Sequence, residues 1–261
     1  RLLLSSGGIL VILGIFGIIT HVFVSKFSSN YRILSTIKDI TNADLQMRKV
    51  EKDFLLIETI NPEFYETGIS RFIMKFEELR NEATDNIIAL KNNKLVHEMN
   101  LNDTLQNIKQ HIDNYHYNIV RLKELIRAKG FKDYGFIGQM REIIHNVEDK
   151  VKAKNDLRSN IYLLTLRRHE KDYLLRKDLK YRERFQKTNE HFIEFLERKN
   201  HSLDYQTSEL INALRRYEQI FLKVIEKDVE IGTENEFGLL KEIHETSKTI
   251  ESDLTHLHDT L

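Results

Sequence analysis

Residues 47–56 read MRKVEKDFLL, and residues 166–175 read LRRHEKDYLL, at an offset of 119 positions. A second likeness pairs residues 117–143 with residues 217–243 at an offset of 100, matching Tyr117 to Tyr217 and Gly138 to Gly238. Both likenesses occur in the same order along the chain. They predict an internal repeat, with one copy in residues 30–152 and the other in residues 155–261. The first copy is longer by the difference between the two offsets.

The composition favours an all-α protein. The chain has 261 residues with 10 Gly and 1 Pro, and a β-rich or doubly wound α/β domain of this length needs more turn residues. The absence of Cys excludes a disulfide framework, a Cys-based zinc site and a thiol nucleophile. The 40 Lys and Arg balance the 40 Asp and Glu without a long basic run. This balance argues against a nucleic-acid partner.

Apolar residues recur at helical spacing between a small number of breaks. The stretch 155–199 contains no strong breaker and would measure about 66 Å as one helix. We expect two long helices, each followed by a helical hairpin. They would form an elongated rod of two stacked four-helix bundles that share the two long helices. The expected breaks are Asn61-Pro62, residues 91–93, residues 130–135, residues 200–202 with Ser202 as an N-cap, and residues 231–235.

The amino-terminal stretch from Leu2 to Val24 carries no Asp, Glu, Lys or Arg. As a helix it would be about 35 Å long, enough to cross a hydrocarbon core of about 30 Å. It lacks the short apolar core and the small-residue cleavage site of a secretory signal peptide. We therefore predict an uncleaved signal anchor over residues 1–24, and we expect a second membrane helix beyond Leu261.

Basic side chains interrupt the apolar stripe of each expected long helix. Arg48 and Lys49 follow Leu45 in the first helix. Burying an unpaired cation costs several kcal/mol, so such a group is paired with a carboxylate or reaches water. The carboxylate could belong to a ligand held in bidentate fashion, or to the chain itself, for instance Glu51 or Glu170. The stripe predicted for the second helix is Leu157, Ile161, Leu164, Arg168, Lys171, Leu175, Phe185, Phe192 and Leu196.

The pairs MRKVEKDFLL/LRRHEKDYLL and GQMREIIH/GLLKEIH resemble the helical bimodular sensor domain of bacterial chemoreceptors and sensor histidine kinases. The likeness covers residues 30–261. It implies that residues 25–261 are a periplasmic domain of two stacked four-helix modules, tethered to the inner membrane and homodimeric. It also implies that arginines bind a small organic acid, such as a dicarboxylate or acetate, between helices. The site residues carried over are Arg48, Arg167 and Arg168 as ligand contacts, with Gly138, His145, Gly238 and His244 as pocket walls.

Other motifs do not change this interpretation. Glu142 and His145 have the E-x-x-H spacing of di-iron bundles, but the second copy reads Glu242-Ile243-His244, so we expect no metal site and no cofactor. A phosphate-cradling glycine loop and a nucleophile elbow are both missing, so we expect no enzyme in this chain. Two alternatives to acid sensing remain: the rod senses a ligand-loaded periplasmic binding protein, or it is a non-sensory membrane-tethered scaffold.

Overall fold

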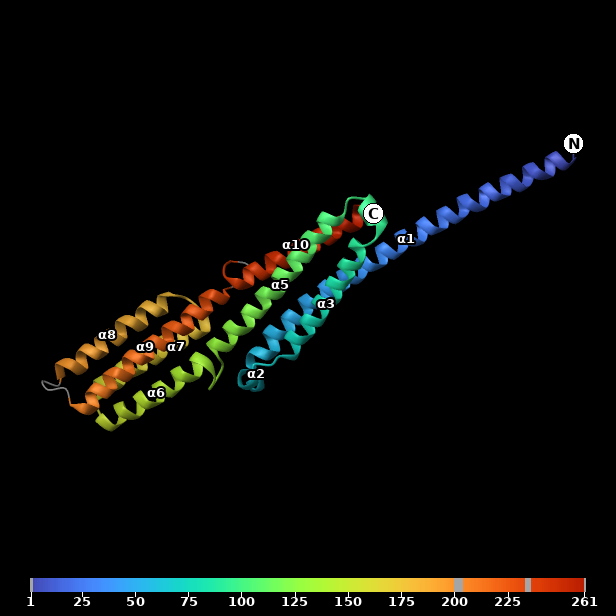
Figure 1. The fold of residues 1–261 in the computed structure, drawn as a ribbon. Coiled ribbons are helices and arrows are strands. Elements are labelled where there is room, and N and C mark those ends of the chain that lie inside the picture. The colour runs from blue at the N-terminus through green and yellow to red at the C-terminus, as the bar shows by residue number, and fades with distance from the viewer. Residues whose placement is uncertain (1, 200–203, 233–235, 261) are drawn as a thin grey trace. The chain divides into compact units, whose positions relative to one another are not determined.

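The computed structural model describes residues 2–199, 204–232 and 236–260, with side chains from residue 13 onward. The regular elements of these ranges are helices (Figure 1), so the predicted all-α class is confirmed. They are α1 (Leu2–Ile57), the 3₁₀ turn Glu58–Ile60, α2 (Pro62–Thr67), α3 (Arg71–Lys91), α4 (Lys94–Glu98), α5 (Asn102–Lys129), α6 (Gly135–Lys154), α7 (Leu157–Arg176), α8 (Lys180–Lys199), α9 (Tyr205–Ile231) and α10 (Leu239–Thr260).

Most helix ends lie where the sequence predicts a break. Asn61 caps α2 by accepting a hydrogen bond from the backbone N–H of Glu63 at 3.2 Å, with Pro62 in the first helical position. Asn93 caps α4 in the same way. The expected turn at residues 200–202, with Ser202, lies outside the described residues, as do residues 233–235. The N-cap of α9 is Asp204, which accepts the N–H of Thr207 at 2.6 Å.

The expectation of one helix over residues 155–199 is wrong. Lys177 ends α7 in the left-handed conformation, with φ of 54°, and its N–H bonds to the carbonyl of Tyr173. The chain then reverses, so that the ring of Tyr162 stacks on Phe192 at 5.2 Å. A lysine rarely adopts this backbone conformation, so the sequence does not predict a turn at this position.

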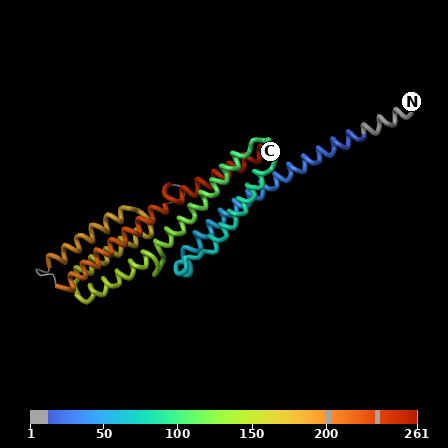
Figure 2. The backbone as a smooth tube through the Cα atoms, in the orientation of Figure 1, coloured from blue at the N-terminus to red at the C-terminus, as the bar shows by residue number. Residues whose placement is uncertain are grey.

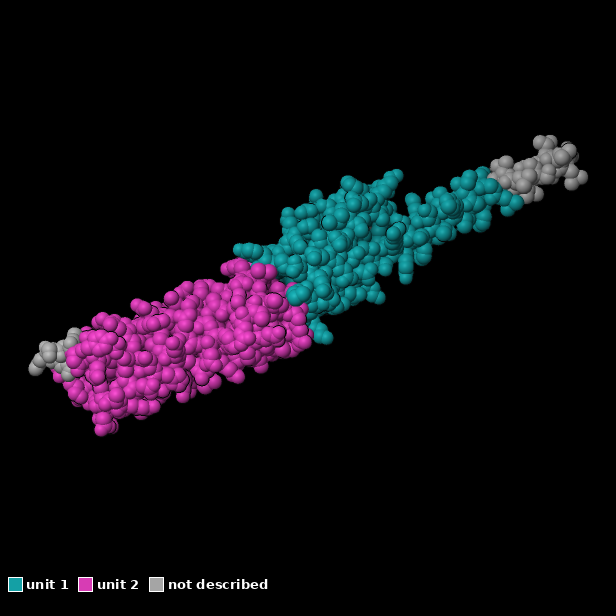
Figure 3. Space-filling model, turned by 60° about the horizontal axis from the view of Figure 1, so that its bottom comes forward, with its two compact units in different colours: residues 1–51, 74–117, 245–261 teal, residues 52–73, 118–244 magenta. Residues whose placement is uncertain are grey.

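Residues 52–73 and 118–244 form one compact unit, called unit 2 here (Figure 3). Four of its helices make a closed ring, in which α6 packs on α9 and α7, and α8 packs on α7 and α9 (Figure 2). Because α7 and α8 lie wholly in unit 2, residues 157–199 are not a helix shared between two bundles. The centre of the ring is aromatic and comprises Tyr173, Phe185, Phe192, Tyr217 and Phe221.

Residues 1–51, 74–117 and 245–261 form the other compact unit, unit 1. Its core takes buried side chains from α1, α3, α5 and α10. The rings of Phe76 on α3 and Tyr115 on α5 meet edge to face at 4.9 Å. Representative core residues, in helix order, are Ile40, Met47, Ala83, Ile112, Ile250 and Leu254.

Buried positions recur between the helices at fixed offsets. Met47 and Leu166 are both buried at the predicted offset of 119. The buried positions of α5 and α9 correspond at an offset of 102, which matches Tyr115 to Tyr217. The pairing of Tyr117 with Tyr217 is therefore wrong, because Tyr117 is 60% exposed and Tyr217 is fully buried. At an offset of 103, the buried positions of α10 match those of α6. The fourth helix of unit 1, α10, comes from beyond residue 155, whereas the fourth helix of unit 2, α6, precedes it.

Two glycine loops precede these fourth helices. Gly130 and Gly135 both have positive φ, and a Cβ on Gly135 would lie 2.6 Å from the Cα of Gly130. The same distance separates a Cβ on Gly238 from the Cα of Gly232. Gly238 therefore corresponds to Gly135, not to Gly138 as the sequence comparison proposed. Only glycine fits these close backbone approaches.

The predicted apolar stripe of α7 faces outward. Leu157, Ile161, Leu164 and Leu175 are 55–80% exposed. The inward face instead carries Leu163, Leu166, His169, Glu170 and Tyr173. Leucines occur on both faces of this helix, so helical spacing alone does not distinguish them.

Among the residues whose side chains are described, no helix is long and apolar enough to span a membrane. The first half of the predicted anchor, residues 1–12, lies outside that set. Residues 13–24 belong to α1, and their large apolar side chains are exposed.

The register of α7 can be tested with two leucines that lie two positions apart. Leu166→Ala should lower the free energy of unfolding by about 2–5 kcal/mol, because it removes a fully buried side chain. Leu164→Ala should change it by less than about 0.5 kcal/mol, since that side chain is exposed. Urea unfolding followed by circular dichroism measures both. Equal losses in the two variants would contradict the observed face.

Candidate functional site

Arg48 lies on α1 between two carboxylates of unit 1. Its Nε donates to Oδ2 of Asp44 at 3.0 Å, and its Nη2 makes a shorter bond to the same oxygen. Its Nη1 donates to Oε2 of Glu251 on α10 at 2.8 Å. The sequence left open whether Arg48 pairs with a ligand carboxylate or with a carboxylate of the chain. The structure shows that carboxylates of the chain neutralise Arg48.

The carboxyl group of Asp44 is almost completely buried, with 1% of the side chain exposed. Burial raises its pKa above the ordinary 3.8; the bond from Arg48 opposes this shift, and the nearby Glu251 adds to it. The Oδ1 atom of Asp44 has no hydrogen-bond partner in the described part of the chain. Asp44 is therefore an incompletely satisfied buried acid whose pKa lies above the ordinary value.

A similar cluster occurs in unit 2 around Arg167. Its Nη1 donates to Glu170 at 2.7 Å, and its Nε lies 3.3 Å from Oε1 of Glu148 on α6. The hydroxyl of Tyr217 on α9 donates to the buried Glu170. Burial raises the pKa of Tyr217, and the neighbouring carboxylate raises it further. This cluster joins α6, α7 and α9 through charge-assisted hydrogen bonds.

Unit 1 repeats part of this arrangement, because the hydroxyl of Tyr115 donates to Glu51. Glu51 and Glu170 occupy the same position of the EKDF/EKDY motif, and Tyr115 corresponds to Tyr217. The repeated motif therefore supplies a glutamate–tyrosine hydrogen bond in each unit, partly buried in unit 1 and buried in unit 2.

The remaining predicted site residues occupy varied positions. Arg168 is exposed on the outward face of α7. His145 is largely exposed, with its Nδ1 3.3 Å from Glu148, so the structure brings His145 and Arg167 to the same carboxylate. Gly138 is buried in α6 against the backbone of Asp133. Gly238 lies in the loop before α10, and His244 is half-buried on α10.

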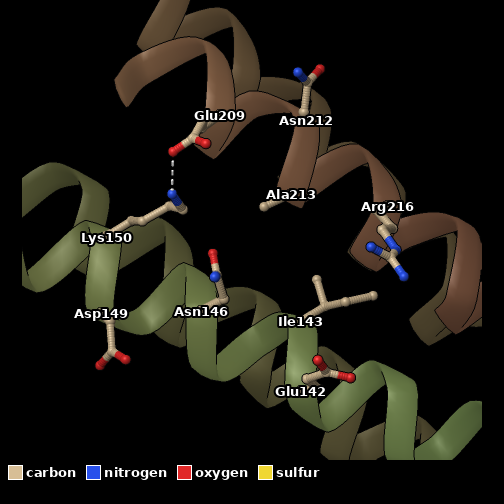
Figure 4. A pocket seen from close by; sticks show the side chains of 9 residues that line it. All are labelled: Glu142, Ile143, Asn146, Asp149, Lys150, Glu209, Asn212, Ala213 and Arg216. Carbon is tan, nitrogen blue, oxygen red and sulfur yellow. Dashed lines mark hydrogen bonds and ion pairs between the residues drawn. The ribbon is translucent and has the colours of Figure 1, made fainter. Parts of the chain in front are cut away.

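A groove of about 570 Å³ runs between α6 and α9 on the surface of unit 2. Figure 4 shows Lys150 bonded to Glu209 at one end, where the distance is 2.6 Å, and Arg216 at the other. Arg216 has no carboxylate within ion-pair distance among the described residues. The groove is also lined by Glu142, Ile143, Asn146, Asp149, Asn212 and Ala213.

The chemistry of this groove suits one small carboxylate. The guanidinium of Arg216 can hold a carboxylate through two parallel hydrogen bonds. The amides of Asn146 and Asn212 can donate to further oxygens. The volume lies within the usual range for small-molecule sites. Because Glu142 and Asp149 also line the groove, a ligand with one carboxylate and a neutral or positive second group fits best.

Comparison with known proteins adds no assignment. No protein-family model matches this chain, and no curated protein matches it. Among the described residues, no three His, Asp or Glu side chains gather to hold a metal ion. The resemblance to helical bimodular sensor domains therefore stays a prediction based on the quoted motifs.

Sequence reasoning named Glu170, which pairs with Arg167, but missed the other acids that pair with the predicted arginines. Asp44 is four residues from Arg48 and could have been found by its helical spacing. Glu251 and Glu148 lie on other helices, so no local pattern identifies them. Arg216 belongs to no sequence motif, and only its position in the groove identifies it as a candidate ligand contact.

Two aspartates of unit 1 should shift stability with pH in opposite directions. Because the folded pKa of Asp44 lies above 3.8, its protonation stabilises the fold at acid pH, and this contribution is lost as the pH rises through the folded pKa. The stability of the wild type relative to Asp44→Asn should therefore fall as the pH is raised from 3.8 to neutrality. Urea unfolding at a series of pH values measures it.

Asp113 supplies the matched control. Burial opposes the shift, but bonds from Lys109 and Arg80 lower the pKa of Asp113 below its ordinary value. Its contribution is present above the unfolded pKa and is lost as the pH falls through the folded one. The stability of the wild type relative to Asp113→Asn should therefore fall toward acid pH. The same slope for both variants would contradict these environments.

Proposed function

We propose that this chain is the sensing part of a membrane-anchored receptor. In this proposal residues 25–261 lie on the extracytoplasmic side, bind a small organic acid and pass a helix displacement across the membrane. The observation that carries the proposal is the continuity of α1. This single helix exposes apolar side chains at its amino-terminal end and buries Ile33, Ile37 and Ile40 in the core of unit 1.

The apolar end of α1 supports the membrane anchor. Over residues 13–24, eight large apolar side chains are 49–69% exposed. Exposed apolar surface costs about 25 cal/mol per Å² relative to an apolar environment, so a lipid bilayer would stabilise this segment strongly. The uncharged residues before it extend the same pattern, and together they would form the anchor over residues 1–24.

The groove beside Arg216 is the best-supported place for the acid. A ligand at Arg48 or Arg167 would have to displace a protein carboxylate that already neutralises the guanidinium. Arg216 needs no such displacement. The proposed principal contact is therefore Arg216, with amides from α6 and α9 completing the site.

The groove and the buried cluster of unit 2 share two helices, which suggests how binding would be transmitted. On α9, Arg216 lines the groove and the next residue, Tyr217, bonds to Glu170. On α6, Asp149 lines the groove and the preceding Glu148 pairs with Arg167. A ligand that draws α6 and α9 together would favour one packing of the cluster over another. Shifts of about 1–2 Å are typical of such transitions, provided that the ligand prefers one state.

Calorimetry with the 261-residue chain in lipid nanodiscs tests the proposal. The titrants are acetate, succinate, malate, glycine and aspartate. At least one acid should bind more tightly than about 1 mM, and Arg216→Gln should weaken it at least about tenfold, or about 1.4 kcal/mol.

Arg215→Gln is the control, because Arg215 is an exposed neighbour that faces Glu197 at 3.5 Å and does not line the groove. It should leave the affinity unchanged. The proposal fails if no acid in the panel binds, or if the two arginine variants behave alike.

One observation favours the alternative that a ligand-loaded binding protein docks on this chain. Leu157, Ile161 and Leu164 form an exposed apolar row on α7. Contiguous apolar surface of this kind is typical of protein–protein contacts. In that case Ile161→Asp should abolish retention of an acid-loaded binding protein on the nanodisc without altering calorimetry of the acids alone. Equal retention by the wild type and the variant would exclude this surface.

A further inference from the structure

A second cleft, of about 520 Å³, lies between α7 and α8 in unit 2. Unlike the groove beside Arg216, it is lined by aromatic side chains. Tyr162 and Phe195 supply two aromatic rings with centroids 5.7 Å apart. Tyr162 also stacks on the buried Phe192, with an interplanar angle of 12°. The buried ring holds Tyr162 in place, so the floor is a preorganised aromatic platform.

Three cationic side chains line the cleft beside this platform, together with His191 and one carboxylate, Glu194. The guanidinium carbon of Arg158 lies 5.5 Å from the ring centroid of Phe195, and the Nζ of Lys199 lies 5.7 Å from it. Arg198 also lines the cleft. Cations near an aromatic face are attracted by the ring, which places these charges beside the platform rather than away from it.

The cations differ in whether they are already neutralised. Lys199 bonds to Asp156 at 2.8 Å, and this bond, together with those from Ser159, lowers the pKa of Asp156 to about 2. Arg198 bonds to Glu194 at 2.9 Å. Arg158 has no carboxylate within ion-pair distance in the described ranges. One guanidinium fork is therefore available beside two aromatic rings.

We propose that this cleft binds a planar aromatic carboxylate. The ring of the ligand stacks on Tyr162 and Phe195, and its carboxylate accepts two hydrogen bonds from Arg158. A single available cation favours a ligand with one negative charge. This ligand class differs from that of the groove beside Arg216, whose apolar side chains are Ile143 and Ala213 and which offers no aromatic ring. The inference does not depend on the proposed function.

Titration of the full chain in nanodiscs with benzoate tests the site, with binding followed by calorimetry and by saturation-transfer NMR. Cyclohexanecarboxylate and inorganic phosphate are the comparison probes. Benzoate should bind at least about threefold more tightly than cyclohexanecarboxylate, because ring pairing adds about 0.5–1.5 kcal/mol. Arg158→Gln should weaken benzoate binding at least tenfold.

Two control variants separate this cleft from other sites. Arg182→Gln changes an exposed arginine of α8 that does not line the cleft and should leave benzoate affinity unchanged. Arg216→Gln removes the acid contact of the other groove and tests whether benzoate binds there instead. Because Arg158 is exposed, its variant should melt at the wild-type temperature, which thermal unfolding checks.

Three outcomes would overturn the inference: no benzoate binding up to about 10 mM, equal affinity of the wild type and Arg158→Gln, or binding of phosphate in place of benzoate. Loss of benzoate binding in Arg216→Gln would assign the aromatic acid to the other groove and would also overturn it.

Discussion

Each unit completes its core with a helix from the opposite side of Asn155 in the sequence. In unit 1 this helix is α10, which contributes Ile250, Leu254 and Leu257, and in unit 2 it is α6. A fully buried Ile or Leu contributes about 1.5–3 kcal/mol. Three such residues are comparable with the net stability of a typical domain, about 5–15 kcal/mol. The positions of the glycine loops, the buried clusters and the α6–α9 groove all depend on this closure.

The sequence predicted the helical class and most helix ends for clear physical reasons. Few glycines, one proline and capping asparagines restrict the backbone to helices and mark where they stop. The turn at Lys177 could not be predicted, because a lysine in a left-handed conformation carries no propensity signal. The inward face of α7 was also missed. Its outward side carries as many leucines as its inward side, and only packing against α6 and α8 distinguishes them.

The chemistry around the arginines was half predictable. The predicted stripes identified Arg48 and Arg168 as inward basic groups that need a partner. Arg48 has one, but Arg168 is exposed, and its neighbour Arg167 makes the internal pair instead. The identity of those partners depends on tertiary structure, since Glu251 and Glu148 come from distant helices. The motif also contains Glu51 and Glu170, which accept hydrogen bonds from Tyr115 and Tyr217. The sequence comparison had matched Tyr217 to Tyr117, two positions from Tyr115. Arg158 and Arg216 stand out only once their surroundings show which cations lack an acid.

Because α10 belongs to unit 1 and α6 belongs to unit 2, cutting the chain between α6 and α7 would not separate the two units. A cut at Asn155, between α6 and α7, would leave α7, α8 and α9 of unit 2 in one fragment with α10 of unit 1. The other fragment would hold the rest of unit 1 together with α2, α6 and the adjoining ends of α1 and α5 from unit 2. Neither fragment would hold a complete core, but the two together would contain every piece of both. The same logic holds between molecules: α10 of one copy could close unit 1 of another at little cost, which is the route by which domain-swapped dimers arise.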